Sequence, residues 1–479
     1  MKKYIPLLAI LLIALAARLY NLRAPLVGIR GWRQADTMAM AINYHENGYN
    51  LFYPQIDWGG NTPGYVEAEF PIYSYAAALL FNLFGVSELS ARLLSIALSL
   101  IGVCYFYLLI KEQVNEQTAL WSCLFISILP LNVFMGRTIM PESLLLTSLI
   151  IGVYYFAQWL NHNKWWHLGI SAIFISTACL VKIPSLYVGL PLLFLAWLKF
   201  EKKVFLQWKL WLFAITIFVT VGAWYYHSHQ IYLQYGLTFG IWEYGTDKWG
   251  NWGLIATWEY WRQIWVEHLG KMFFVWFAYP IFIFGLFQKR ITENEKVFDY
   301  WLAGIIIYFI IVGRGNFVHD YYQLPFTIPA AVYLGKVYAK YFNKNNIYAY
   351  LALAATLIGI FISSAYYYTT VYAQSEDPRK SAKYELAQLI TKDTNKDALI
   401  IVIDNNDPTA LYLSNRKGWR GSIQDILNES LLNERIENGA QYLAGICPDK
   451  TQCNRIQNIL NKYDIIFEKK EYFIVKLKN

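Results

Sequence analysis

Seven ionisable residues stand at the ends of apolar segments or in the loops between them, where they could take part in acid–base chemistry. They are Asp36, Glu69, Glu142, Lys182, Arg314, His319 and Asp320. Carboxylates can accept a proton from a reacting group, and Lys or Arg can stabilise negative charge in a transition state. The middles of the predicted membrane spans contain no charged residues, whereas an ion-coupled transporter usually has them there. The pattern favours chemistry at one face of a membrane.

Each of these residues also has an interpretation without catalysis. Asp36 and Glu69 can be ordinary surface carboxylates, and Glu142 lies in the first turn of a predicted helix, where a carboxylate interacts favourably with the helix dipole. Lys182 can extend its amine toward the headgroups, and the stretch 319–322 can belong to an aromatic belt. Their common position on one predicted side of the membrane favours a joint site.

The composition indicates which elements must position these residues. Of 479 residues, 56% are hydrophobic and 15% are charged, whereas an ordinary soluble domain has roughly 25% charged residues. Aromatic residues reach 18%, which suits long membrane–water boundaries. These values exclude a disordered chain, a collagen-like fibre and a small disulfide-stapled module. The net charge of +8 comes mostly from the apolar part, so it does not indicate a nucleic-acid partner.

Apolar stretches recur through the first 374 residues, and crossing a bilayer takes about 20 such residues in a helix. We predict about eleven spans, at 4–20, 89–110, 118–135, 143–160, 166–181, 185–199, 210–227, 269–288, 298–312, 323–341 and 347–368. If the N-terminus is cytoplasmic, the cytoplasmic turns contain 14 of the 25 basic residues before residue 375, as the positive-inside rule requires. An odd number of spans then places the C-terminus outside.

The predicted fold class is a polytopic α-helical membrane protein with a small C-terminal α/β domain. Residues 1–374 form the transmembrane domain, with long external loops at 21–88 and 228–268. Within the first loop, apolar residues at helical spacing in 34–46 predict an amphipathic helix. The apolar stretch 71–84 is too short to span, so we expect it to lie in the membrane interface.

The last 105 residues, 375–479, contain 31 of the 74 charged residues and are predicted to form the external soluble domain. Helical and strand-like patterns alternate there. We expect helices near 382–390, 422–436 and 452–462, and strands near 398–403, 442–446, 465–467 and 472–475. The domain has no glycine-rich phosphate loop, so a nucleotide site has little support.

Five short motifs follow one another in an order that resembles a known family. They are Gly31-Trp32-Arg33-Gln34-Ala35-Asp36, Glu69-Phe70-Pro71-Ile72-Tyr73, Arg137-Thr138-Ile139-Met140-Pro141-Glu142, Leu180-Val181-Lys182-Ile183-Pro184 and His319-Asp320-Tyr321-Tyr322-Gln323-Leu324-Pro325. Their order and sidedness resemble the C-type (GT-C) multi-span glycosyltransferases, in the branch of the protein O-mannosyltransferases and aminoarabinose transferases. The resemblance covers about residues 1–370, and an external C-terminal domain is common in that superfamily.

The resemblance implies an inverting glycosyltransferase of the plasma membrane, with its active site on the external face. The donor would be a polyprenyl phosphate carrying a hexose or pentose, and the acceptor a lipid, a glycan or a protein. Asp36 and Glu142 would be the catalytic residues, with Asp36 as the general base and Glu142 as the acidic residue that positions the donor sugar or the acceptor. Lys182 and Arg314 would bind the donor phosphate.

The remaining motif residues would contact the sugar or a metal. These are Glu69, His319 and Asp320, of which Glu69 and His319 are the candidate metal ligands. The resemblance requires no cofactor, and a divalent cation stays an open alternative. The expected partners are the polyprenyl-phosphate sugar, the acceptor and membrane lipids.

Two departures from the family pattern leave the substrate open. Thr37 follows Asp36 where the mannosyltransferases usually have Glu, and a single proline, Pro71, follows Phe70 where the aminoarabinose enzymes keep Lys and two prolines. The reaction type therefore carries over, but the sugar and the acceptor do not. The alternative functions are a non-catalytic transporter or flippase of lipid-linked sugars and a polymerase or ligase of lipid-linked glycans.

Cys447 and Cys453 in the external domain are the candidates for a disulfide, because an oxidising compartment would let them close a small loop. The other cysteines, Cys104, Cys123 and Cys179, lie within predicted spans. Alkylation of the native protein with and without reductant, read by mass spectrometry, tests the pair. The two thiols should react only after reduction, and labelling without reductant would contradict the disulfide.

Overall fold

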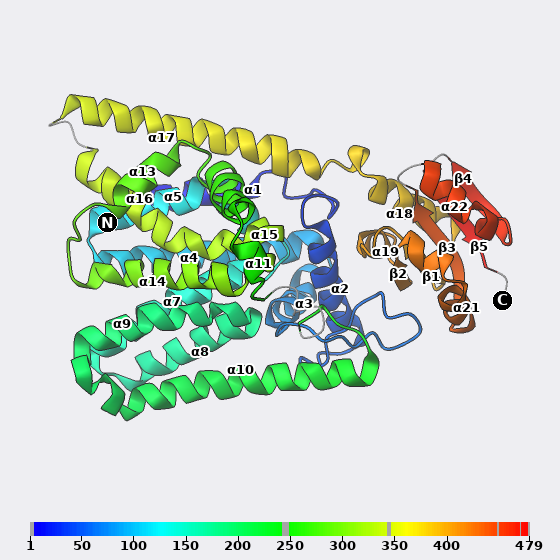
Figure 1. Cartoon of the computed structure of the whole chain (residues 1–479), viewed down its shortest axis with the longest axis horizontal. Helices are drawn as coiled ribbons and strands as arrows, with labels where there is room; N and C mark the ends of the chain where they lie inside the picture. The colour runs from blue at the N-terminus through cyan, green and yellow to red at the C-terminus, as the bar shows by residue number, and fades with distance from the viewer. Residues whose placement is uncertain (1–3, 242–248, 343–345, 448–449, 470, 478–479) are drawn as a thin grey trace. The chain divides into compact units, whose positions relative to one another are not determined.

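The computed structural model of the chain describes residues 4–241, 249–342, 346–447, 450–469 and 471–477. The chain folds as two compact units, each built from three separate segments, and Figure 1 shows their helices and strands. Unit 1 consists of Met1–Leu22, Arg92–His227 and Gly240–Thr369, and unit 2 consists of Arg23–Ala91, Ser228–Phe239 and Thr370–Asn479. The first long loop therefore belongs to the same compact unit as the C-terminal residues.

Unit 1 is helical throughout its described length. Its main helices are α1 (Ile5–Leu19), α4 (Glu88–Gln113), α5 (Glu116–Ile128), α6 (Pro130–Met135), α7 (Glu142–His162), α8 (Trp165–Val181), α9 (Gly189–Phe200), α10 (Trp208–Tyr235), α13 (Ala278–Leu286), α14 (Val297–Ile311), α16 (Thr327–Tyr341) and α17 (Ile347–Tyr367). Shorter α-helices are α11 (Trp252–Ile255), α12 (Trp258–Arg262) and α15 (Gly313–Val318). The 3-10 helices are η2 (Ile183–Val188), η3 (Glu201–Leu206), η5 (Asn294–Lys296) and η6 (Asp320–Phe326), and the π-helices are η4 (Gln263–Phe273) and η7 (Tyr368–Ala373). Closely packed helix pairs include α7 with α8 and α5 with α16.

Every predicted span overlaps helical residues, although 118–135 and 269–288 each cover two helices separated by a break. Fewer helices are long and apolar enough to cross a membrane by themselves. Among the described residues, five helices are long and apolar enough to cross a membrane: Glu88–Gln113, Glu142–His162, Ile183–Leu206, Trp208–Tyr235 and Ile347–Ala373. A sixth span results if Trp258–Phe273 and Ala278–Leu286, which meet at a bend of 119°, count as one. The chain therefore has membrane-spanning helices, and the number eleven stays a prediction.

Two helices of unit 1 end close to prolines. Leu129 is extended (φ −65°, ψ 133°) between α5 and α6, because the residue before a proline is excluded from the helical region. Lys182 is also extended (φ −151°, ψ 109°) where α8 ends, two residues before Pro184. The break places Lys182 at the end of α8 and not in the middle of the helix.

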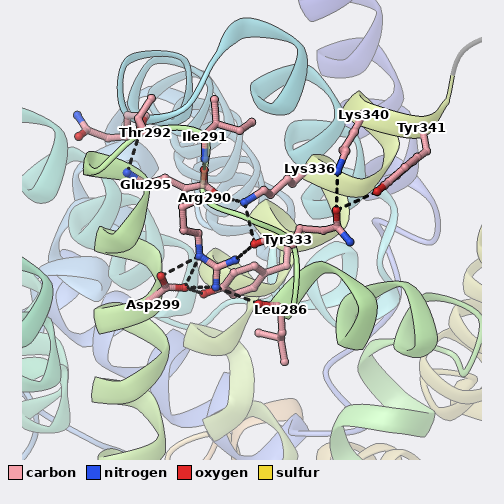
Figure 2. A network of polar contacts seen from close by, with 12 residues as sticks. Leu286, Arg290, Ile291, Thr292, Glu295, Asp299, Tyr333, Lys336, Lys340 and Tyr341 are labelled. Atoms are coloured by element: carbon pink, nitrogen blue, oxygen red, sulfur yellow. Dashed lines mark hydrogen bonds and ion pairs between the residues drawn. The ribbon is translucent and has the colours of Figure 1, made fainter.

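A network of polar contacts joins the α13–α14 connection to α16 in unit 1 (Figure 2). Arg290 donates to both carboxylate oxygens of Asp299, at 2.6 and 2.8 Å, and the Tyr333 hydroxyl donates to the same carboxylate. Lys336 and Glu295 form an ion pair in which both side chains are almost completely buried. Arg290 and Lys336, two of the basic residues on which the predicted orientation rests, therefore also form ion pairs within the fold.

Unit 2 contains a five-stranded sheet in the order β2-β1-β3-β5-β4. Its strands are β1 (Leu399–Ile403), β2 (Lys417–Gly421), β3 (Ala440–Ile446), β4 (Asp464–Lys469) and β5 (Tyr472–Lys476). Strand β1 pairs in parallel with both β2 and β3, whereas β5 runs antiparallel to β3 and β4. The helices are α18 (Ala382–Asp393), α19 (Thr409–Leu413), α20 (Ile423–Leu427), α21 (Glu429–Glu437) and α22 (Lys450–Leu460), with a 3-10 turn η8 (Pro378–Lys380). The predicted α/β pattern is confirmed, and β2 and α19 are elements that the sequence did not reveal.

The first loop contributes two helices to unit 2, and both were predicted. They are α2 (Gly31–Asn47) and α3 (Ile72–Phe84). One face of the sheet, with Ile400 and Val402, packs on Met40, Ile56 and Trp58 of this loop, together with α18 and α19. The other face, which includes Ile401 and Ile403, packs on α20, α21 and α22. Because β1 is covered on both faces, it is continuously apolar.

The loop also covers the free edge of the sheet. Gly418 of β2 donates its N–H to Asp57 O at 2.9 Å and accepts from Gly60 N at 2.7 Å. Gly60 has φ +65°, and a Cβ there would lie 2.3 Å from the Trp419 ring. Glycine at this position lets the loop approach the edge strand, which removes an exposed row of backbone hydrogen-bonding groups.

Two sequence expectations fall partly outside the described residues. The side chain of Cys453 is one of them, so the Cys447–Cys453 disulfide stays a prediction. The predicted orientation rests in part on Lys2, Lys3 and Lys344, which lie outside the described residues.

The buried Lys336–Glu295 pair yields a prediction about stability. Lys336→Met should lower the melting temperature of the detergent-solubilised protein strongly, because removal of one partner leaves a buried charge and costs about 3–5 kcal/mol. The double variant Lys336→Met/Glu295→Leu should recover most of the loss. Lys296→Met is the matched control, since its exposed pair with Glu293 contributes little. A double variant as unstable as Lys336→Met would contradict the assignment.

Candidate functional site

Asp36 lies one turn into α2, in the interior of unit 2. The helix begins at Gly31, after Arg30 in the left-handed region (φ 63°), and a Cβ on Gly31 would lie 2.5 Å from Leu26 O. Asp36 is 1% exposed. Its Oδ1 accepts from Trp58 Nε1 at 2.9 Å, and its Oδ2 has no hydrogen-bond partner among the described residues. One carboxylate oxygen is thus fixed by a hydrogen bond, while the other is buried without one among the described residues.

Burial raises the pKa of Asp36 to about 6, from an ordinary value of 3.8. The positive charge of Arg420, the Trp58 hydrogen bond and the charge of Arg33 lower this pKa, in that order, and Asp407 raises it. A pKa near 6 leaves most of the carboxylate ionised at neutral pH and still able to take a proton. Proton transfer by a side chain is most efficient when its pKa lies near the operating pH.

Glu69 is held by an ion pair within the same unit. Arg33, one turn before Asp36, donates to Glu69 Oε2, and its guanidinium lies 5.1 Å from the centre of the Phe239 ring. Thr37, the residue that departs from the mannosyltransferase pattern, donates its hydroxyl to Arg33 O at 2.8 Å. Glu69 therefore holds Arg33 on the helix that carries Asp36.

A second buried carboxylate, Glu67, was not identified from the sequence. It is fully buried and its Oε1 lies 3.2 Å from His229 Nδ1, while Thr238 Oγ1 donates to Oε2. His229 lies in the last turns of α10, 162 residues away in sequence. No local pattern marks such a pairing, so only the fold could reveal it.

In unit 1, Glu142 and Lys182 form an ion pair. Glu142 is the first residue of α7, and Lys182 Nζ donates to its Oε1 at 2.6 Å. The same amine lies 4.5 and 4.9 Å from the ring centres of Tyr321 and Tyr322, close enough for cation–π attraction. Two motifs and the aromatic pair of a third therefore meet at one amine, as their common predicted side suggests.

Three more candidate residues, His319, Asp320 and Arg314, lie near Tyr321 and Tyr322 in the sequence. The His319 ring lies 5.1 Å from the Tyr322 ring, and buried Asp320 accepts from the backbone N–H of Tyr321 at 2.8 Å. Arg314 is exposed on α15, and the next residue, Gly315, packs against the Tyr322 ring. Arg314 thus belongs to the same segment, with its guanidinium in a solvent-accessible position.

A buried arginine on the first helix also reaches this region of unit 1. Arg18 of α1 is 2% exposed and donates to Ala14 O at 2.9 Å. Together with Asn132 and Glu142 it lines a cavity of about 30 Å³, a size that can hold one or two water molecules. Arg18 Nε and Glu142 Oε2 have no hydrogen-bond partner among the described residues. Arg18 is the only charged residue in the predicted span 4–20, and this was the sequence signal for it.

A metal centre receives no support from the described part of the chain. No group of three or more His, Cys, Asp or Glu side chains there could hold a metal ion. Of the two candidate ligands, Glu69 belongs to unit 2 and is paired with Arg33, and His319 belongs to unit 1.

Comparisons with known proteins agree with this architecture. Residues 67–227 match the family described as dolichyl-phosphate-mannose-protein mannosyltransferase. Among solved structures, ArnT from Cupriavidus metallidurans bound to undecaprenyl phosphate superposes with a TM-score of 0.66 at 13% identity, covering 98% of this chain and 97% of ArnT. The chain has the GT-C fold. The resemblance inferred from the motifs is thereby confirmed at the level of the fold.

A second GT-C structure gives the same result over a larger protein. The archaeal oligosaccharyltransferase AglB from Archaeoglobus fulgidus, in complex with an inhibitory peptide and a dolichol-phosphate, has a TM-score of 0.61 at 14% identity. The match covers 93% of this chain and 70% of AglB. A search of the curated proteins finds no match to the sequence. Both structural neighbours and the matching family are glycosyltransferases.

The raised pKa of Asp36 predicts a pH-dependent loss of stability. Because the folded pKa of about 6 exceeds the ordinary 3.8, folding takes up a proton between these values. This contribution is present below pH 4 and is lost as the pH rises to 6, by about 3 kcal/mol. Asp36→Asn removes the loss, so its melting temperature relative to wild type should rise between pH 4 and pH 8.

Thermal unfolding in detergent across this pH range measures the effect. Asp397→Asn, at an exposed position of the same unit, is the control and should leave the pH dependence unchanged. A constant difference between Asp36→Asn and wild type from pH 4 to pH 8 would contradict the environment described for Asp36.

Proposed function

We propose that this chain is an inverting glycosyltransferase that moves a sugar from a polyprenyl phosphate to a lipid, glycan or protein acceptor. The observation that carries the proposal is the environment of Asp36, with one carboxylate oxygen fixed by Trp58 and the other without a hydrogen-bond partner among the described residues. The GT-C fold supports a lipid-phosphate donor, because ArnT was solved with undecaprenyl phosphate and AglB with dolichol-phosphate.

In the proposed reaction, Asp36 is the general base. The acceptor O–H or N–H gives its proton to Asp36 Oδ2 while its lone pair attacks the anomeric carbon of the donor. The glycosidic bond forms as the bond between the anomeric carbon and the phosphate oxygen breaks, and the polyprenyl phosphate leaves with the electron pair. A single displacement of this kind inverts the anomeric configuration, as in inverting glycosidases, where one carboxylate activates the nucleophile.

Lys182 and Arg314 are proposed to stabilise the charge of the leaving phosphate. The lysine amine has three donors, so it can keep its bond to Glu142 and bind a phosphate oxygen at the same time. Glu142 and the Tyr321 and Tyr322 rings would hold the amine in one place. Exposed Arg314 would add charge without the cost of a buried, unpaired cation.

The other motif residues receive supporting roles. Glu69 would orient Arg33 near Asp36, and its partly exposed side chain would also contact the sugar. His319 and Asp320 are proposed to contact the donor sugar beside the aromatic pair. No step of this mechanism passes through a metal, since the described residues do not assemble a ligand set.

We also propose an orientation in the plasma membrane. The N-terminus would be cytoplasmic, and the C-terminal domain with residues 375–479 would be external. This placement is supported by the distribution of basic residues in the predicted turns.

Substitutions at Asp36 and Lys182 test the proposal. Asp36→Asn should lower kcat by about 10²–10⁴-fold, because it removes the base. Lys182→Gln should lower kcat by about 10²–10³-fold through the loss of one charge-stabilising donor, and it should weaken the binding of undecaprenyl phosphate. Transfer is measured in membranes that lack the chromosomal copy, with radiolabelled polyprenyl-phosphate sugars made by those membranes, and binding by native mass spectrometry.

Controls separate this function from its alternatives. Asp36→Asn should still bind undecaprenyl phosphate, and Lys209→Gln, at a partly exposed lysine bonded to Asn163, should keep full turnover. Binding or translocation of the labelled lipid without a new glycosidic bond would identify a transporter instead. Transfer of preassembled oligosaccharides only would identify a polymerase or ligase.

A further inference from the structure

Strand β2 of the C-terminal residues carries an arginine to the surroundings of Asp36. The guanidinium carbon of Arg420 lies 3.7 Å from the centre of the Trp58 ring, which is close stacking contact for a cation over an aromatic face. Its Nη1 also donates to Asn406 O at 3.2 Å, in the connection that follows β1. Arg420 therefore has a fixed position on the indole.

Trp58 connects this arginine to the carboxylate. Its Nε1 donates to Asp36 Oδ1 at 2.9 Å, and its ring meets the edge of Phe239 with 6.0 Å between ring centres. The indole is 8% exposed, so it is confined on several sides. The guanidinium covers one face of the ring, and the orientation of the ring determines whether the N–H points at Asp36.

The contact also brings charge to Asp36 from outside its own helix. The charged groups that act on Asp36 are Arg33 on α2, Arg420 on β2 and Asp407 in the connection after β1. Asp407 is itself paired with Lys383 of α18, and Arg33 is paired with Glu69. Arg420 is the largest of the attractive contributions, since its effect on the Asp36 pKa exceeds those of Trp58 and Arg33.

We infer that Arg420 is a positioning residue for Asp36, acting through its stack on Trp58, so that the C-terminal domain completes the environment of the base. The stacking and the two hydrogen bonds are features of unit 2 alone. The catalytic consequence rests on the proposed function of Asp36. The inference gives the C-terminal domain a role in the reaction in addition to a role in folding.

Two substitutions separate the charge of Arg420 from its shape. Arg420→Gln removes the charge, and Arg420→Lys keeps the charge but loses the planar group that stacks on the indole. Arg379→Gln is the matched control, because Arg379 belongs to the same unit and is 87% exposed in a pair with Asp377.

The first readout is the dependence of kcat/KM on pH. Loss of a nearby opposite charge should move the acid-side midpoint of Arg420→Gln upward by about one pH unit. Arg420→Lys should keep the midpoint near that of wild type, with a maximal rate lowered roughly tenfold by the misplaced Trp58 N–H. A merely structural role would lower the melting temperature of both variants and leave the midpoint unchanged, which would overturn the inference.

The second readout needs no substrate. Arg420→Gln is made in the wild-type and the Asp36→Asn backgrounds, and melting temperatures are compared at pH 4 and pH 8. In the wild-type background the substitution should be more destabilising at pH 8, where Asp36 is ionised, and the pH difference should vanish with Asp36→Asn. An equal effect in both backgrounds at pH 8 would overturn the inference.

The two readouts also distinguish failure of the inference from failure of the proposed function. If no donor supports transfer, the proposed function fails, and the melting-temperature cycle still decides whether Arg420 acts on Asp36. If Asp36→Asn abolishes transfer while both Arg420 variants behave like Arg379→Gln, the proposed function stands and Arg420 has no positioning role.

Discussion

Removal of a carboxylate from water is the constraint around which unit 2 is organised. Asp36 is buried in a helix whose residues are almost all inaccessible, and burial disfavours its ionised form. The cost is offset by a hydrogen bond from Trp58 and by cations from α2 and β2. Because these partners come from segments hundreds of residues apart, the charge state of one side chain depends on the assembly of the whole unit.

The same principle recurs in unit 1 with different partners. Buried Glu142 is paired with Lys182, and buried Glu295 is paired with Lys336. A buried ion pair contributes little net stability compared with apolar packing, but loss of one member is costly. A chain with only 15% charged residues thus uses several of them at positions where each requires its partner. This leaves few charges for the water-exposed surface and ties local side-chain chemistry to helix packing.

Local patterns in the sequence predict the helices, because hydropathy and proline positions act over a few residues. The break at Lys182, the start of α7 at Glu142 and the helix around Asp36 follow from such signals. The motif order also led to the GT-C fold. The sequence predicted only that Glu142 and Lys182 lie on the same side of the membrane. It did not predict their ion pair, because no short-range pattern encodes a contact between residues 40 positions apart.

The sequence did not predict the elements and residues whose role depends on contacts with distant parts of the chain. Strand β2 reads Lys417-Gly418-Trp419-Arg420-Gly421, with two glycines and two cations, so it lacks the apolar alternation of a strand. Its conformation is stabilised by β1 on one side and by the Asp57–Gly60 loop on the other. Glu67 with His229, and Arg18 in the first helix, likewise acquire partners only in the folded chain.

The interleaving of segments in unit 2 has a consequence for biosynthesis. Trp58 and Asp36 are made early, whereas Arg420 follows Asp36 by 384 residues, a delay of about 20–80 s at the usual rates of synthesis. During that interval the loop around Asp57 has no strand to pair with, and the base lacks its strongest attractive charge. Asp36 therefore acquires its complete environment only after β2 has been synthesised.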